Sequence, residues 1–133
     1  MAFEPKKYDS GQTLSLKQAA SSTVTKYDGL DTSSGYVQRA TSATTFVPFV
    51  SLEDNVNAAA TYTEILCVRT DGVLFECDTA GATSQALVGT FLDLTDHDTI
   101  NQAASTTNVL FVTGLVGATT DNKVEGYFMQ NVA

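Results

Sequence analysis

Short segments of alternating apolar and polar residues, together with short apolar runs, occur along most of this chain and predict strands. An apolar residue at every second position is the pattern of a strand with one buried face. Turn signals rich in Gly, Asp, Asn and Ser separate the segments, as in small all-β folds. The predicted strands are residues 12–17, 36–40, 45–52, 86–92, 109–116 and 123–129. Because Pro48 has no N–H to donate, the strand 45–52 is expected at a sheet edge or at a bulge.

The clearest predicted element is a hairpin over residues 64–78 that turns at Asp71-Gly72. This dipeptide favours a two-residue type I′ turn between antiparallel strands. The resulting register places one set of side chains on the core face: Leu66, Val68, Val73, Phe75 and Cys77. Cys67 then points to the other face, opposite Glu76, so the two cysteines cannot form a disulfide. Two free thiols are typical of a reducing compartment.

Composition supports an all-β fold class, because the chain has 20 Thr, 10 Ser and few runs of strong helix formers among its 133 residues. Residues branched at Cβ suit a pleated sheet better than a helix. We therefore predict a small barrel or sandwich in a single domain over residues 11–133. Residues 1–10 are predicted to be an extended N-terminal arm, and residues 98–104 are the one predicted short helix.

The net charge of −8 excludes several classes of partner. A nucleic-acid binder needs clustered Lys and Arg, and so does a protein that binds an anionic membrane surface. The sequence shows no signal-peptide pattern and no apolar segment long enough to span a membrane, so we expect synthesis in a cytoplasm. Residues 1–26 carry four lysines against two acidic residues, whereas the remainder carries three cations against thirteen. This asymmetry suggests contacts between copies or an arm that binds another protein, although both faces could simply be solvated.

Candidate chemistry is sparse. His97 is the single histidine, and Asp96, His97 and Asp98 are the ligands to test for a metal. Adjacent residues rarely converge on one ion and no second cluster supplies more ligands, so a loop that caps a helix at Thr95 or Asp96 is the favoured interpretation. The chain lacks a Gly-x-Ser-x-Gly elbow and a phosphate-binding glycine loop. We expect no catalytic residues, no cofactor and no enzymatic activity.

Several stretches resemble the capsid decoration (cement) proteins of tailed bacteriophages. They are RTDGVLFECD (residues 69–78), LVGT (87–90), DLTD (93–96) and a C-terminal part over residues 112–128. The resemblance covers most of residues 8–129. It implies a β-rich, β-tulip-like body on the outside of an assembled head, often as a trimer, bound to the major capsid protein. The resemblance implies no active site. The polar stretch over residues 95–107 matches no part of the family that contacts the capsid.

Three other function classes stay open. Another small virion component, such as a tail or head-completion protein, is the first alternative, since small barrels occur there too. A sugar-binding module lacks support, because the chain has no Trp to stack on sugar rings. A metal hydrolase depends on His97 alone.

Under the decoration hypothesis, the N-terminal arm supplies the docking residues. Phe3 and Tyr8 would provide apolar area next to Pro5 and the cations Lys6 and Lys7. Such an arm would stay disordered until it bound a capsid groove. The alternative is a frayed terminus without a role.

Overall fold

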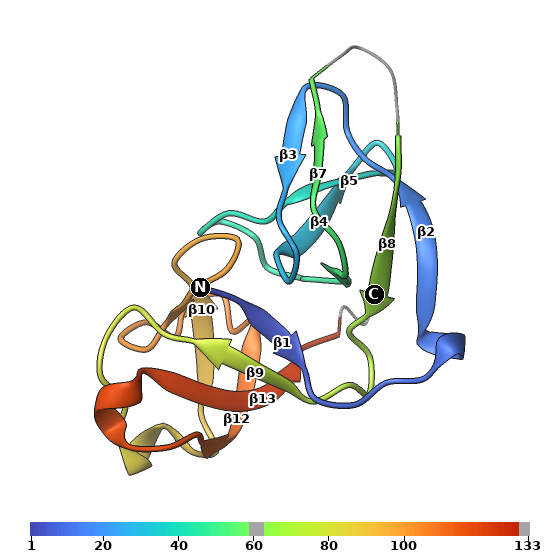
Figure 1. Cartoon of the computed structure of the whole chain (residues 1–133). Helices are drawn as coiled ribbons and strands as arrows, with labels where there is room; N and C mark the ends of the chain where they lie inside the picture. The colour runs from blue at the N-terminus through green and yellow to red at the C-terminus, as the bar shows by residue number, and fades with distance from the viewer. Residues whose placement is uncertain (59–62, 131–133) are drawn as a thin grey trace.

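The computed structural model describes residues 1–58 and 63–130. It confirms the all-β fold class, with 44% strand and no helix of seven or more residues in the described part. Two curled sheets and a small two-stranded sheet make up the molecule, and Figure 1 shows the two larger sheets as an upper and a lower half. The described residues contain no helix long and apolar enough to cross a membrane.

The lower half is a six-stranded antiparallel sheet in the order β1-β9-β13-β12-β10-β11. Its strands are β1 (Phe3–Pro5), β9 (Phe75–Asp78), β13 (Lys123–Phe128), β12 (Leu110–Leu115), β10 (Phe91–Leu94) and β11 (Ile100–Asn101). Thr79, just after β9, forms a parallel bridge to Ile100 in β11. This bridge curls the sheet back on itself, so that one face encloses a core.

The upper half is a five-stranded sheet in the order β2-β8-β6-β4-β5. Its strands are β2 (Thr13–Lys17), β8 (Glu64–Arg69), β6 (Phe49–Ser51), β4 (Gly29–Ser33) and β5 (Tyr36–Arg39). A bridge between Gln18 and Val37 brings β5 to the end of β2. The small sheet pairs β3 (Ser22–Val24) with β7 (Asn55–Asn57), and three single turns of 3₁₀ helix are η1 (Ser10–Gln12), η2 (Gln85–Leu87) and η3 (Thr119–Asp121).

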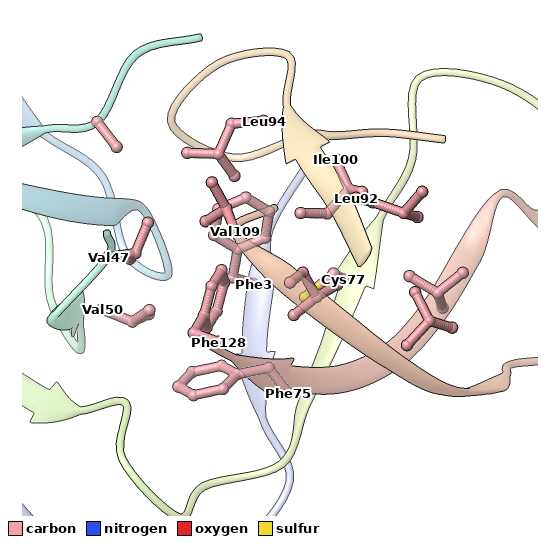
Figure 2. Close-up of a cluster of buried hydrophobic side chains, with 14 of the residues drawn as sticks. Phe3, Val47, Val50, Phe75, Cys77, Leu92, Leu94, Ile100, Val109 and Phe128 are labelled. Carbon is pink, nitrogen blue, oxygen red and sulfur yellow. The ribbon is translucent and has the colours of Figure 1, made fainter. Parts of the chain in front are cut away.

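The larger hydrophobic core lies against the six-stranded sheet and is built around aromatic rings (Figure 2). Phe128 makes edge-on contacts with Phe3 and Phe75, at ring-centroid distances of 5.3 and 5.1 Å. Val47 and Val50 from the upper half also belong to this core, so it joins the two sheets. A second, smaller cluster lies within the upper half: Val24, Leu30, Val37, Ile65 and Cys67.

The predicted hairpin over residues 64–78 is wrong. Gly72 has the positive φ of +73° that a tight turn needs. However, β8 pairs with β2 and β6, whereas β9 pairs with β1 and β13, so the two strands belong to different sheets. The burial of β8 is consequently inverted at two positions, because Leu66 is exposed and Cys67 is fully buried. Both cysteines are nevertheless free, as predicted.

The predicted helix over residues 98–104 is also wrong, since Ile100–Asn101 is strand β11. The polar stretch that follows it is fixed by one carboxylate. Asp93 accepts hydrogen bonds from the backbone N–H groups of Thr106, Thr107 and Asn108 at 2.8 to 2.9 Å. Burial alone would raise the pKa of Asp93, but these three donors outweigh it and hold the pKa below its usual value. The polar loop therefore has a structural role inside this chain.

Four of the remaining six predicted strands are confirmed with shifted ends, and the other two are confirmed only in part. The segments 12–17, 36–40, 109–116 and 123–129 correspond to β2, β5, β12 and β13. The segment 45–52 is a strand only over Phe49–Ser51, because Pro48 interrupts it. In the segment 86–92, η2 and Gly89 at φ +85° precede strand β10, which starts at Phe91.

Candidate functional site

Three side chains with metal-binding chemistry meet where the two halves of the molecule touch. Asp28 lies directly before β4 in the upper half, and His97 and Asp98 lie in the loop between β10 and β11. His97 Nε2 is 3.9 Å from Asp28 Oδ1 and 3.7 Å from Asp98 Oδ2. We call Asp28, His97 and Asp98 the junction cluster.

The Asp28 carboxylate is held firmly on one side. It is 1% exposed, and its Oδ2 accepts hydrogen bonds from Arg39 Nε and from the Thr25 N–H, each at 2.8 Å. No hydrogen bond reaches Oδ1 from the residues that the structure describes, and His97 faces this oxygen. One carboxylate oxygen is thus anchored while the other is directed at the imidazole.

Asp98 is arranged in the same way. Its Oδ1 accepts a hydrogen bond from Thr99 Oγ1 at 2.9 Å, whereas Oδ2 faces His97 and lies 3.8 Å from the N-terminal ammonium of Met1. Burial and hydrogen bonding with Asp96 raise the pKa of Asp98. The loop thus sets the Asp98 carboxyl on the same side of the imidazole as Asp28.

Asp96, the third ligand named from the sequence, is not part of the junction cluster. Its Oδ1 accepts a hydrogen bond from the Asp98 N–H at 3.0 Å and shapes the loop. Burial alone would raise the pKa of Asp96, but hydrogen bonds from Asp98 outweigh it and lower the pKa. The sequence therefore identified two of the three clustered residues and missed Asp28.

The backbones also approach closely beside the junction cluster. The Gly29 N–H donates to the His97 carbonyl at 2.6 Å. A Cβ at position 29 would lie 2.9 Å from the Phe3 ring and 3.2 Å from the His97 carbonyl oxygen. Only glycine lets the two loops come this close, and the contact fixes the distance between Asp28 and the loop over residues 97–98.

The predicted N-terminal docking arm requires a correction. Residues 3–5 form the outer strand β1 of the six-stranded sheet, paired in register with β9. Phe3 is 0% exposed within the large core, and Pro5 is buried as well. Phe3 and Pro5 are therefore core residues in this fold and are not available as anchors for a partner. The sequence interpretation failed because the segment is polar on average, although its alternate residues face inward.

Lys6 and Lys123 flank a row of acidic side chains on the outer face of this sheet. Lys6 Nζ lies 2.8 Å from Glu76 Oε2, and Lys123 Nζ lies 2.7 Å from Asp78 Oδ1. Hydrogen bonds to these carboxylates, aided by their charge, raise the pKa of both lysines. Lys6, named above as a docking cation, is thus engaged in an exposed intramolecular ion pair.

Lys7 and Tyr8 remain at the surface, where they border a groove of about 340 Å³. Leu74 and Tyr127 line the same groove. The remaining residues that line it are Asp9, Gln12 and Gly72.

Next to this groove, three aromatic side chains occupy neighbouring strands in register. Phe91 on β10 pairs with Phe111 on β12, and Phe111 pairs with Tyr127 on β13. Phe91 is 36% exposed and Tyr127 is 41% exposed, and the rings of Phe91 and Phe111 lie 5.1 Å apart. We call Phe91, Phe111 and Tyr127 the aromatic row. This apolar surface was not predicted from the sequence, although the pairing register of the C-terminal strands could have revealed it.

The two thiols have the properties of core residues. Both are 0% exposed. Burial raises the pKa of Cys67 to about 12, with a contribution from Glu53, and burial also raises the pKa of Cys77 well above its usual value. A nucleophilic cysteine needs a lowered pKa and access, so neither thiol is suited to that chemistry in the folded state.

Comparisons with known proteins give no match, whether to protein-family models, to curated proteins or to solved structures.

Proposed function

We propose that this protein decorates the outside of a tailed-bacteriophage capsid and stabilises it by binding the major capsid protein. The observation that carries the proposal is the sequence resemblance over residues 69–78, 87–90, 93–96 and 112–128. A protein in this role works through surface and stability rather than through a catalytic pocket. Its proposed location is the virion, after synthesis in the host cytoplasm.

The arrangement of the resembling stretches supports the proposal. They supply β9, half of β10, most of β12 and all of β13, and these four strands lie side by side in the six-stranded sheet, between β1 and β11 at its ends. Stretches separated in sequence therefore build one continuous structural unit. This is expected if the shared pattern preserves a sheet whose outer face binds a partner.

Within this proposal, the docking surface is the aromatic row with the adjoining groove at Lys7 and Tyr8. Exposed aromatic side chains are enriched at the centres of protein interfaces, where they bury large area at small entropic cost. The groove adds Tyr8 and a cation next to Tyr127. The proposed occupant is the major capsid protein, and of the N-terminal candidates only Lys7 and Tyr8 keep a docking role.

We also propose that the protein acts as a trimer. Three copies of a modest docking surface on one particle would raise the overall affinity through effective concentration, without a new type of contact. Sedimentation equilibrium of the purified chain measures this directly.

Cosedimentation with capsid shells from the same virus tests the function. Unexpanded and expanded shells are mixed with the full chain, and the bound protein is quantified per capsid subunit. We expect saturable binding to expanded shells and none to unexpanded ones. A tail or head-completion protein would bind neither lattice, and that result would overturn the proposal.

A further inference from the structure

The spacing within the junction cluster leaves room for an ion. The separations of 3.7 and 3.9 Å from His97 Nε2 to the two carboxylate oxygens exceed hydrogen-bond length, and the three ligand atoms lie within 4.8 Å of one another. An ion at the centre of such a triangle lies roughly 2.2–2.5 Å from each ligand atom, against roughly 2.0–2.2 Å in zinc proteins. Shifts of the ligand atoms by a few tenths of an ångström would bring these distances into the range of zinc proteins.

The surrounding groups orient the ligands toward this centre. Arg39 and the Thr25 N–H hold Oδ2 of Asp28, and Thr99 holds Oδ1 of Asp98. The two oxygens left over, Asp28 Oδ1 and Asp98 Oδ2, both face His97 Nε2. Outer hydrogen bonds of this kind fix the ligating oxygens in metal sites. Asp28 is also 1% exposed, and its inward oxygen accepts no hydrogen bond within the described part of the chain.

We propose that Asp28, His97 and Asp98 bind a divalent transition-metal ion, with Zn²⁺ as the preferred ion. One imidazole with two carboxylates suits zinc, whereas Ca²⁺ and Mg²⁺ favour sets made of oxygen alone. Three protein ligands leave a coordination position for water or for a donor from a partner. This site is independent of the proposed capsid contact.

The ion would join the two halves of the molecule. Asp28 belongs to the upper half and the loop over residues 97–98 to the lower half, with the Gly29–His97 hydrogen bond beside them. The metal ion would have to replace the N-terminal ammonium of Met1, which lies 3.8 Å from Asp98 Oδ2 and belongs to a residue whose side chain is half exposed. Exposed pairs of this kind contribute little, so replacement costs little.

Zinc titration of the full chain, followed by calorimetry, tests the proposal. We expect one Zn²⁺ per chain, with affinity reduced at least about 100-fold in His97→Ala and at least about tenfold in Asp98→Asn. The matched control is Asp96→Asn, whose amide oxygen can still accept the Asp98 N–H. It should lose clearly less affinity than Asp98→Asn, because Asp96 lies outside the cluster and acts only through its hydrogen bonds with Asp98.

Co²⁺ in place of zinc excludes binding by the two thiols. The proposal requires a spectrum without a thiolate-to-cobalt charge-transfer band. The absence of zinc binding, equal affinity of His97→Ala and the parent chain, or a thiolate band would each overturn it. Equal losses of zinc affinity in Asp96→Asn and Asp98→Asn would also overturn it, because the ligands would then be the adjacent residues Asp96, His97 and Asp98. Circular dichroism of each variant confirms that the fold is retained.

Discussion

The two halves of the molecule bury their cores by different means. The six-stranded half packs aromatic rings, with Phe128 in edge-on contact with Phe3 and Phe75. The five-stranded half packs a small aliphatic cluster next to a fully buried polar side chain, Gln18. Aromatic contacts add to the large area that such rings bury, whereas a buried amide stabilises only if its hydrogen bonds are made. The lower half therefore relies on ring packing, whereas the upper half adds a polar network to its smaller apolar cluster.

The outer surfaces of the two halves also differ, in the apolar side chains that they expose. The six-stranded sheet exposes the aromatic row, while the described part of the upper half exposes Val56 on β7, at 68%, and Leu66 on β8, at 39%, on strands that do not pair with each other. A contiguous apolar surface marks an interaction site, but a single exposed side chain does not. Under the proposed function, docking would belong to the six-stranded half, which also contains the aromatic core.

Phe3→Ala should destabilise the protein most, because it removes a ring from the aromatic core. The change should reduce the free energy of unfolding by about 3–5 kcal/mol. Tyr8→Ala, five residues later at the surface, should change it by only about 0.5 kcal/mol. Urea denaturation measures both. If both substitutions changed the free energy of unfolding equally little, residues 1–10 would be a free arm, as predicted from the sequence.

Asp93→Asn should come next, with a loss of about 2–3 kcal/mol, because a buried charge-assisted acceptor of three N–H groups is weakened. The pH dependence has a definite sign. The pKa of Asp93 is lowered in the folded protein, so its contribution is present above the unfolded value of about 4 and lost as the pH falls through the folded value. Melting temperatures of the parent and the variant should therefore converge below about pH 4. A constant difference down to pH 2 would contradict this role.

Gln18→Ala should weaken the upper half by about 1–3 kcal/mol. Its Nε2 donates to the Ser22 carbonyl and Oγ at 3.0 Å, and Asn55 Nδ2 donates to its Oε1 at 2.8 Å. The exposed Gln85→Ala is the matched control and should be neutral within about 0.5 kcal/mol. A neutral Gln18→Ala would show that the network is dispensable.

The alkylation rates of the two cysteines measure local opening of the two halves separately, and we expect only a small difference between them. Cys67 lies in the small cluster and Cys77 in the aromatic core. Pulse alkylation with peptide mass spectrometry should modify both thiols after denaturation. In the native state it should modify Cys67 several-fold faster than Cys77, since the smaller cluster opens at lower free energy. Faster labelling of Cys77 would reverse the ranking of the halves.

Individual strands were predictable because alternation is a local property, as β12 and β13 show. Strand pairing was not predictable, because it depends on distant partners. Asp71-Gly72 favours a turn in any context, but β8 gains two neighbours, β2 and β6, by leaving β9 to the other sheet. The turn signal carries no information about that choice.

The candidate site could likewise be predicted only in part, because it depends on residues that are distant in the sequence. His97 and Asp98 were identified by residue type, whereas Tyr27-Asp28-Gly29 has only the composition of a turn, and nothing in it points to a ligand. Only the fold brings Asp28 to the histidine. Phe3 was misassigned for a related reason, since three residues are too few to show a strand period.

Under the proposed function, the aromatic row is the capsid-binding surface, and shell binding by matched surface variants decides whether it is. Phe91 and Tyr127 are replaced together by serine, and Val56→Ser in the upper half serves as the control. We expect the double variant to keep its melting temperature within a few degrees and to bind expanded shells at least about tenfold more weakly, because exposed aromatic anchors dominate such interfaces. Val56→Ser should bind like the parent. Undiminished decoration by the folded double variant would contradict the assignment.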